Sequence, residues 1–395
     1  MSTLRIATRQ LVSRSLVFRA GVRTYTTVPP KARQSSTAKL ALIGTGVGAV
    51  GGSCYTFYSN WLDKNAHKEH EKYAPTIVKD FPKDVQITKR YVNPKDNSNL
   101  DIVLFQFQTC PFCCKVRAYL DSVGISYSVV EVDAVLRQDI RWSKYKKVPM
   151  VLVRQKENEN EGFIQLTDSS TIISVLASYM HNRKQNLVEL ANFYPNISFF
   201  DDDGTKKHDI MNKYFLMYQD QAPKNMTKED QELERKWRNW ADHHLVHLIS
   251  PNCYRTYGES VETFNWFSDA GEWHIYFPKW ERDLMVYAGA VAMWGISKLL
   301  IKKHKLTEDV RGHIYNALDS WTDELKKKKT TFLGGKQPNL ADISVFGILN
   351  SMEGCQAFKD CLENTNIGEW FFAMKTLTTN NRGELIREKI VNHQS

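Results

Sequence analysis

An apolar run at residues 102–107 is the strongest strand pattern in the chain, and a thiol motif and a helical pattern follow it directly. The run is rich in Ile, Val, Leu and Phe, which favour strands. Cys110 and Cys113 then form a Cys-X-X-Cys motif with Pro111 after the first thiol. Proline is tolerated at the first position of a helix, where its missing N–H would have no partner anyway. The pattern predicts a strand that leads directly into a helix beginning at Pro111.

This arrangement gives Cys110 a chemical role. The positive end of the helix dipole favours a thiolate, which is the reactive form of cysteine. A zinc site would need a second pair of ligands, and the cysteines at positions 54, 253, 355 and 361 do not repeat the motif. Seven scattered cysteines also argue against a structural disulfide between Cys110 and Cys113. A strand, a Cys-X-X-Cys motif and a helix are typical of a thioredoxin-like fold with a redox or glutathione-handling thiol.

The next 70 residues are consistent with the same fold. Alternation at residues 126–132 predicts a second strand, and residues 136–145 predict a short helix. Val148 and Pro149 precede a third strand, where thioredoxin-like folds hold a cis proline. Residues 163–166 predict an edge strand, and Asp168 and Ser169 then open a helix that runs to about residue 182. These two polar residues cap that helix, and its N-terminus is also a candidate carboxylate site.

From about residue 205 the chain predicts mostly helices. Thr227 begins a capping box that uses Asp230 in place of the usual Glu, and Asn339 begins a similar cap. Residues 287–300 predict a buried helix with several small residues, and residues 307–328 predict an amphipathic one. His243 and His247 stand four residues apart, but no Glu completes a metalloprotease motif, so no metal is expected. The predicted fold class is α/β plus all-α.

The N-terminal part has a different composition. No acidic residue occurs before Asp63, and eight Lys and Arg residues in that stretch account for +8 of the net charge of +9. The remainder is therefore nearly neutral, so the basic balance does not indicate a nucleic-acid partner. Residues 1–37 are typical of a mitochondrial presequence, with a disordered basic arm as the alternative.

A single transmembrane helix is expected at residues 38–60. Residues 40–58 carry no charge, and 19 residues are just long enough to cross a hydrocarbon core. A short buried segment is the alternative. The expected division is a leader at 1–37, the span at 38–60, a tether at 61–97, a thioredoxin/glutaredoxin-like domain at 98–183 and a helical domain at 184–395. A single-pass membrane protein with its folded domains in the aqueous phase follows from this division.

Several motifs together resemble the membrane-associated prostaglandin E synthase type 2 family, within the glutathione transferase superfamily. The resemblance covers about residues 98–375, and its motifs occur in consistent order. They lie at residues 109–118, 129–132, 147–149, 168–174, 237–242, 245–256 and 336–342. The resemblance implies a glutaredoxin-like domain followed by a helical domain of the glutathione transferase type.

The resemblance also implies a function. It implies isomerisation of prostaglandin H2, or of a similar lipid peroxide, to prostaglandin E2, with the Cys110 thiolate as nucleophile. Because the thiol is returned, Cys113 need not act as a second redox group. A homodimer and a mitochondrial or Golgi membrane are implied as well. Glutathione is the implied cofactor, and haem is a second candidate. The glutathione positions are Cys110, Val148, Pro149, Asp168 and Ser169, and the haem positions are His247, Ser250 and Lys303.

The sequence departs from the family at two places. Phe107 stands where the family has a catalytic tyrosine, and Leu299 stands where it has an arginine beside haem. Two other functions therefore stay open. One is a glutaredoxin-like thiol oxidoreductase, for which Cys113 is essential. The other is a non-catalytic glutathione- or haem-binding membrane protein.

Overall fold

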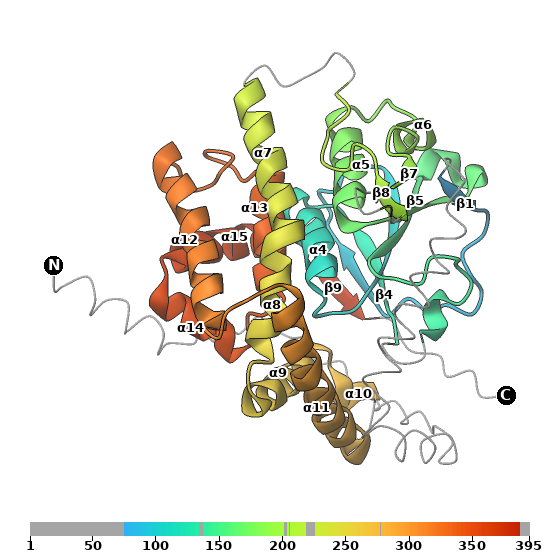
Figure 1. The fold of residues 1–395 in the computed structure, drawn as a ribbon. Coiled ribbons are helices and arrows are strands. Elements are labelled where there is room, and N and C mark those ends of the chain that lie inside the picture. The colour runs from blue at the N-terminus through green and yellow to red at the C-terminus, as the bar shows by residue number, and fades with distance from the viewer. Residues whose placement is uncertain are drawn as a thin grey trace. The chain divides into compact units, whose positions relative to one another are not determined.

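The computed structural model describes residues 75–133, 137–200, 204, 206–218, 226–276 and 278–387 (Figure 1). The predicted leader, the predicted span at residues 38–60 and residues 61–74 of the predicted tether lie outside these residues. The rest of the predicted tether is not a spacer, because residues 76–78 and 89–92 form strands of the main sheet. The described part combines a thioredoxin/glutaredoxin-like sheet with a helical layer of the glutathione transferase type. The α/β plus all-α prediction is therefore confirmed.

A mixed seven-stranded sheet forms the first layer. Its order is β1-β6-β5-β3-β4-β2-β9, and β3 is parallel to β4 but antiparallel to β5. The central strand β3 is buried along most of its length because its Ile, Val, Leu and Phe side chains pack on both faces. The strands are β1 (Thr76–Val78), β2 (Lys89–Val92), β3 (Leu100–Gln106), β4 (Tyr127–Glu131), β5 (Met150–Gln155), β6 (Phe163–Thr167) and β9 (Glu384–Arg387).

The first helices differ in part from the sequence prediction. Helices α4 (Pro111–Val123), α5 (Ser169–His181) and α6 (Leu187–Ala191) belong to this layer. In place of the helix predicted at residues 136–145, the described residues carry a 3-10 turn at Gln138–Ile140. A second 3-10 turn covers Lys156–Glu161. The predicted edge strand is not at the edge, because β1 pairs with the outer side of β6.

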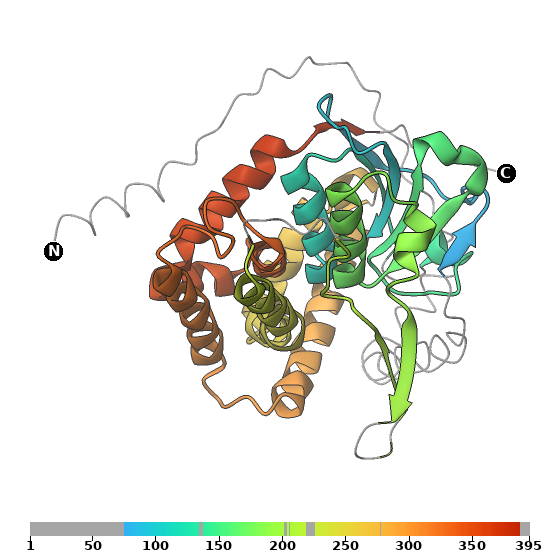
Figure 2. The same cartoon turned by 90° about the horizontal axis from the view of Figure 1, so that it is seen from above.

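A separate two-stranded hairpin connects the layers. Strands β7 (Asn196–Phe200) and β8 (Lys206–Ile210) pair with each other in antiparallel register. Figure 2 shows this hairpin extending away from the larger sheet. The sequence analysis predicted no strands here, and the second strand, with the residues KKHDI, has no apolar alternation that would indicate one.

The second layer is helical. Both predicted caps are present, since Thr227 and Asn339 each accept from the helix that follows and complete a capping box. Edge-to-face contacts from Trp321 to Trp237 and to Trp370 join three of its helices. The helices are α7 (Lys228–Trp240), α8 (Val246–Cys253), α9 (Tyr257–Ala270), α10 (Trp273–Tyr276), α11 (Lys279–Lys303), α12 (Val310–Lys328), α13 (Leu340–Asn350), α14 (Gln356–Asn364) and α15 (Ile367–Asn381).

Helix α11 is not the buried helix that the sequence predicted. Along its 25 residues only Val286, Ala290 and Ser297 are buried. Among the described residues it is also the one helix long and apolar enough to cross a membrane, by length and composition alone. The small residues that suggested burial are therefore not evidence that this helix lies in the core.

The two layers meet along α4. Helices α13 and α15 pack against it, and Figure 1 shows α4 between the sheet and the helical layer. The contact with α13 is backbone-close at Gly347, where an added Cβ would lie 2.4 Å from the Cα of Lys115. Because no side chain fits there, the glycine sets the spacing between the thiol-bearing helix and the second layer.

Candidate functional site

The thiol motif stands where the sequence placed it. Cys110 is the residue before α4, and Pro111 occupies the first position of that helix. The N–H of Cys114 donates to the carbonyl of Cys110 at 2.9 Å, and the N–H of Cys110 donates to the carbonyl of Phe107 at 3.2 Å. The Cys110 side chain therefore lies at the positive end of α4, as predicted.

The second thiol tunes the first. The thiol of Cys113 hydrogen-bonds to Cys110, and this contact lowers the pKa of Cys110 although burial opposes it. The backbone N–H groups of Cys113 and Phe112 and the charge of Arg117 act in the same direction. Burial raises the pKa of Cys113 well above its usual value, so Cys113 stays protonated and keeps donating. The pair therefore works as one thiolate and one donor.

Arg117 supplies a buried positive charge close to the thiols of the motif. Its guanidinium donates to the Sγ of Cys114 at 3.0 Å, to the carbonyl of Gln108 at 2.6 Å and to Gln106 Oε1 at 2.6 Å. The sequence assigned no role to Cys114, and burial in fact raises its pKa, which leaves it as an inert partner of the arginine. The sequence analysis did not single out Arg117, although its position four residues after Cys113 could have indicated that the two side chains lie on one face of the helix.

The candidate anion site is built on the start of α5. The Asp168 side chain accepts from the N–H groups of Ser170 and Thr171, both at 2.9 Å, so the predicted cap is confirmed. Asp168 itself has φ of 65°, in the left-handed region that a non-glycine residue rarely adopts. The hydroxyl of Thr171 is buried and has no hydrogen-bond partner among the described residues. Val148 and Pro149 are joined by a cis peptide bond, as expected.

Tyr145 is a site residue that the sequence analysis missed. It packs with Phe107 and Val148 in the core on one face of the sheet. Burial raises the pKa of Tyr145, and so do the nearby charges of Asp168 and of the Cys110 thiolate. The hydroxyl therefore stays protonated, close to the thiol motif and to the start of α5. The signal available in the sequence was a tyrosine just before the proline loop.

A buried ion pair from the second layer supports the start of α5. The ammonium group of Lys115 is fully buried and donates to Asp242 and, at 2.9 Å, to the Ser170 hydroxyl. Ser170 donates to the other Asp242 oxygen at 2.5 Å, and the Tyr214 hydroxyl donates to that same oxygen at 3.1 Å. Burial opposes the charge of Asp242, yet Lys115, the Ser170 hydroxyl and the charge of Arg238 lower its pKa. The carboxylate therefore stays charged between the layers.

The backbone of the second layer is adjusted to reach this position. Residues Ala241–Leu245 form one π-helical turn between α7 and α8, and Asp242 lies in it. Such turns often occur at functional sites, because they redirect a side chain without ending the helix. One turn earlier, Arg238 is fully buried and donates to the Ser174 hydroxyl at 2.7 Å and to the Ser170 carbonyl at 3.1 Å. The second layer thus holds α5 by two charged side chains.

A cavity of about 240 Å³ opens beside the thiol motif. Thr109, Pro111 and Phe112 line it from the start of α4. The opposite wall comes from α8, α9 and the end of α13, and consists of Val246, His247, Ile249, Ser250, Cys253, Tyr254, Phe267 and Ser351. The lining is mostly apolar, so this space suits a hydrophobic substrate next to Cys110.

The predicted haem positions are only partly brought together. His247 and Ser250 line the cavity, whereas Lys303 is exposed near the end of α11. The His247 ring stacks on His304, with ring centroids 4.3 Å apart. Burial and the neighbouring His304 lower the pKa of His247, which favours its neutral form. Within the described ranges no group of three or more His, Cys, Asp or Glu side chains could hold a metal ion.

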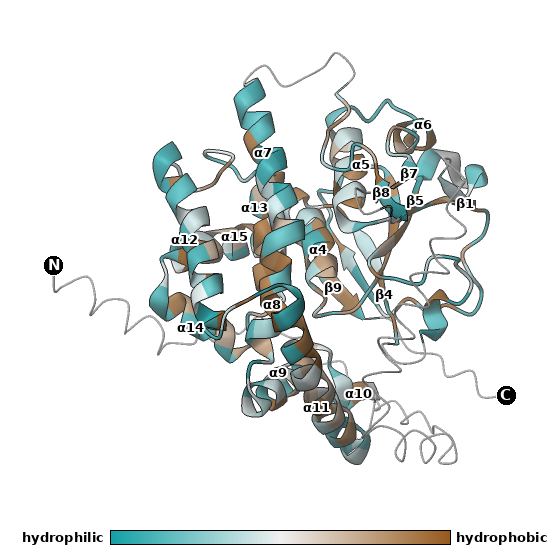
Figure 3. Cartoon of the chain, in the orientation of Figure 1, coloured by the Kyte–Doolittle hydropathy of each residue, from teal (hydrophilic) through white to brown (hydrophobic). Residues whose placement is uncertain are grey.

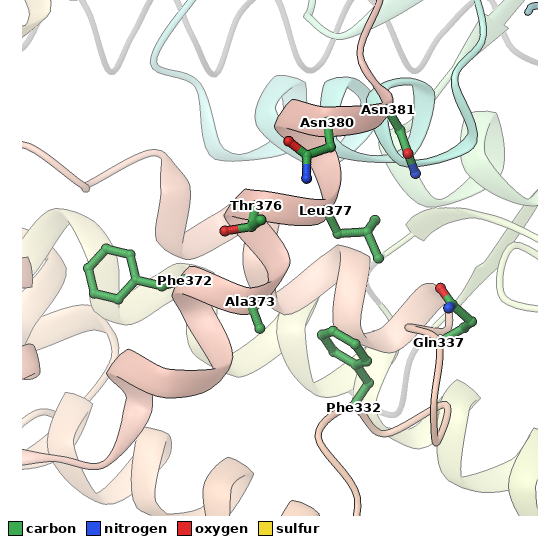
Figure 4. A pocket seen from close by; sticks show the side chains of 8 residues that line it. All are labelled: Phe332, Gln337, Phe372, Ala373, Thr376, Leu377, Asn380 and Asn381. Carbon is green, nitrogen blue, oxygen red and sulfur yellow. The ribbon is translucent and has the colours of Figure 1, made fainter. Parts of the chain in front are cut away.

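A larger cavity of about 720 Å³ lies elsewhere, against α15 (Figure 4). Its walls are Phe332, Gln337, Phe372, Ala373, Thr376, Leu377, Asn380 and Asn381. No thiol, carboxylate or imidazole lines it, so we assign the chemistry to the smaller cavity beside Cys110.

Two family models match parts of the chain. The glutaredoxin family model matches residues 102–157, and the model for the glutathione S-transferase C-terminal domain matches residues 305–371. The chain is also similar to solved structures of low identity. A glutathione S-transferase from Pseudomonas fluorescens has a TM-score of 0.36 at 13% identity, over 69% of this chain and 93% of that one. The β-etherase LigF from Sphingobium has a TM-score of 0.39 at 14% identity, over 71% and 99%.

Two curated relatives are much more similar in sequence. Prostaglandin E synthase 2 of Danio rerio is 42% identical over 284 residues, which are 71% of this chain and 72% of the relative. Prostaglandin E synthase 2 of Mus musculus is 38% identical over 337 residues, which are 85% of this chain and 81% of the relative. With this identity over most of both lengths, the chain belongs to the prostaglandin E synthase 2 family, a family of enzymes.

Proposed function

We propose that this chain isomerises prostaglandin H2 to prostaglandin E2, with the Cys110 thiolate as the nucleophile. The relatives carry the name of this activity. The observation that carries the proposal is the Cys110 thiol, whose pKa is lowered by the Cys113 donor, beside a mostly apolar cavity. A thiolate at neutral pH is what an attack on a peroxide oxygen requires.

The reaction needs no net oxidant. The Cys110 sulfur attacks one oxygen of the endoperoxide, so an S–O bond forms while the O–O bond breaks. The released alkoxide takes up a proton and becomes a hydroxyl group. The carbon that carries the sulfur-bound oxygen then loses its proton, a C=O bond forms, and the S–O electrons return to sulfur as thiolate. One proton is gained and one is lost, so the product is an isomer and Cys113 is never oxidised.

Glutathione is the second part of the proposal. Cys110, Val148, Pro149, Asp168 and Ser169 would hold it, with its γ-glutamyl carboxylate at the start of α5. The unpartnered hydroxyl of Thr171 and the N-terminal end of α5 fit a negatively charged group there. Glutathione would supply a second thiol near Cys110.

Haem does not fit the described residues well. Lys303, a predicted haem position, is exposed near the end of α11 and does not line the cavity beside His247. Leu299 is 60% exposed and offers no charge to a propionate group. No step of the proposed reaction therefore passes through haem.

Four further parts of the proposal concern the whole chain. The division at residues 37, 60, 97 and 183 stays a prediction, as do membrane attachment through residues 38–60 and a mitochondrial or Golgi location. The charged composition of residues 61–73 supports a spacer between a membrane and the folded layers. A homodimer is also proposed.

The test is product formation by the full chain in detergent. Prostaglandin H2 and reduced glutathione are added to the chain and to Cys110→Ser, and prostaglandin E2 is measured above the spontaneous rate. We expect formation that depends on Cys110. Equal product from both proteins would refute the proposal.

Thiol–disulfide exchange is the second candidate function, because Cys113 lies within hydrogen-bonding reach of Cys110. Cys113→Ser separates the two functions. It should retain most isomerisation, since serine can still donate to Cys110, but it should abolish dithiol reduction of a mixed disulfide. Loss of both activities would favour the exchange reaction.

A further inference from the structure

A second pair of thiols lies at the wall of the cavity beside Cys110. Cys253 ends α8 and lines the cavity, whereas Cys355 is fully buried next to it. The Cys253 thiol donates a hydrogen bond to the Cys355 sulfur, and both cysteines are free. In Figure 3 hydrophobic residues, in brown, are prominent on α8. The pair therefore belongs to an apolar part of the cavity wall.

Cys355 has the same place on its helix that Cys110 has on α4. Each thiol is carried by the residue that precedes the helix, where the positive end of the helix dipole favours a thiolate. The first turn of α14 carries no acidic residue. The N–H of Phe358 donates to the carbonyl of Cys355 at 3.0 Å. The second pair thus repeats the combination of a capping thiol and a donor thiol without the Cys-X-X-Cys spacing.

Nearby donors and charges favour one negative charge on this pair. The hydrogen bond from Cys253 lowers the pKa of Cys355, although burial opposes it. The Thr263 hydroxyl and the charges of Arg311 and Lys359 act in the same direction. The same hydrogen bond, together with burial, raises the pKa of Cys253 well above its usual value. The two sulfurs therefore share one proton and one negative charge.

Arg311 is held beside the pair by its own hydrogen bonds. Its buried guanidinium donates at 2.8 Å to the carbonyl of Asn252, the residue before Cys253. It also donates at 2.9 Å to the carboxylate of Asp360 on α14, and at 3.2 Å to that of Glu259 on α9. These contacts fix the end of α8 against α14, so the two sulfurs are held within reach of one another.

We propose that Cys253 and Cys355 form a second redox site, at which an organic hydroperoxide in the cavity is reduced to an alcohol while the two thiols become a disulfide. The mostly apolar lining suits the organic part of such a substrate. His247 and Ser250 line the same cavity and can hydrogen-bond to the peroxide oxygens. The proposal is independent of the isomerase reaction, because the Cys-X-X-Cys thiols take no part in it.

The reaction balances as a two-electron oxidation of the pair. The shared proton moves to Cys355, which leaves the negative charge on Cys253 at the cavity. The Cys253 sulfur attacks the terminal oxygen of the hydroperoxide, so an S–O bond forms, the O–O bond breaks and an alkoxide leaves. The alkoxide takes the proton from Cys355 and becomes an alcohol. The Cys355 thiolate then attacks the Cys253 sulfur, an S–S bond forms, and the oxygen leaves as hydroxide, which takes a solvent proton and becomes water.

The alternative is that the pair only fills the core, since buried cysteines are usually inert. Cys361 is an example of an inert thiol on the same helix, because burial raises its pKa to about 12 and it does not line the cavity. Cys253 and Cys355 differ from it in their contact with each other and in the access that the cavity gives to Cys253. Cys361 is therefore the matched control.

Oxidation of the full chain in detergent tests the proposal. The reduced Cys110→Ser variant serves as the parent, so that the thiolate of the first pair cannot consume the reagent. Cumene hydroperoxide is added, free thiols are alkylated, and tryptic peptides are analysed by mass spectrometry. We expect a disulfide-linked peptide pair that contains Cys253 and Cys355, with about one cumyl alcohol formed for each linked chain.

Three further variants of this parent identify the reacting thiols. Cys253→Ala and Cys355→Ala should each slow hydroperoxide consumption about tenfold, whereas Cys361→Ala should leave it unchanged. Unchanged consumption in both of the first two variants would overturn the proposal. So would a parent chain that gives no linked peptide, or one that links Cys361 in equal yield, which means oxidation of an opened chain. The linked peptide is measured with both thiols in place, so this result does not depend on how the alanine variants fold.

Discussion

The buried pair between Lys115 and Asp242 allows a quantitative prediction. Asp242→Asn keeps the shape of the side chain and one oxygen for the Ser170 and Tyr214 donors, but it removes the negative charge. The Lys115 ammonium group, which has no exposed surface, then lacks its counter-charge. Breaking a buried pair in this way costs about 3 to 5 kcal/mol. We expect the free energy of unfolding to fall by that amount.

Urea unfolding of the full chain, followed by tryptophan fluorescence, measures this loss. Asp323→Asn is the matched control, because it breaks the Lys326–Asp323 pair, whose side chains are 60% and 59% exposed. That loss should be below about 1 kcal/mol. The double variant Lys115→Met with Asp242→Leu removes both charges and should recover much of the stability.

The reasoning is wrong if Asp242→Asn costs no more than Asp323→Asn. It is also wrong if the apolar double variant is less stable than Asp242→Asn alone, because the damage would then come from lost packing rather than from an unpaired charge. A fall in glutathione affinity for Asp242→Asn, measured by calorimetry under conditions where it is folded, would show that the pair also positions the start of α5.

Three other variants test the site and the fold. Cys113→Ala removes the donor to Cys110 and should raise the pKa of that thiol, seen in thiolate absorbance against pH, while Cys114→Ala should leave it nearly unchanged. Tyr145→Phe should lower Cys110-dependent turnover about tenfold, and Phe107→Tyr should change it less. A larger effect of Phe107→Tyr than of Tyr145→Phe would show that Tyr145 takes no part in the reaction. Burial raises the pKa of Asp121 from 3.8 to about 6. Between pH 3.8 and about pH 6 the folded chain holds the proton and the unfolded chain does not, so the free energy of unfolding falls as the pH rises through this range. In Asp121→Asn, the difference in the free energy of unfolding between pH 4 and pH 7, measured by urea titration, should be smaller by up to about 3 kcal/mol.

The local patterns around the site were predictable because they depend on nearest neighbours. A strand of β-branched residues, a proline after Cys110 and an Asp at the start of α5 each act within one helical turn. The strand, the start of the first helix and the cap of α5 could therefore be predicted from the sequence. The same holds for the capping boxes that begin at Thr227 and Asn339.

The long-range parts were not predictable in this way. Nothing near Lys115 indicates a partner 127 residues away, and nothing near Asp242 indicates a π-helical turn. Helix α11 misled the prediction for a related reason, since an apolar helix in the core and an exposed apolar helix can have the same composition. Tyr145 was missed because no spacing rule connects a loop residue to a thiol 35 positions earlier.

The last strand has a consequence for how the chain matures. Strand β9 pairs with β2, and the Asn93 side chain donates to the Asn381 carbonyl across 288 positions of sequence. On the ribosome, β2 therefore emerges long before the strand that covers its edge. At about 5 to 20 residues per second, that edge stays open for about 15 to 60 seconds. The unpaired strand edge of a nascent chain can pair with other nascent chains on the same messenger RNA. The edge of β2 therefore needs to be covered, for example by a chaperone, until synthesis ends.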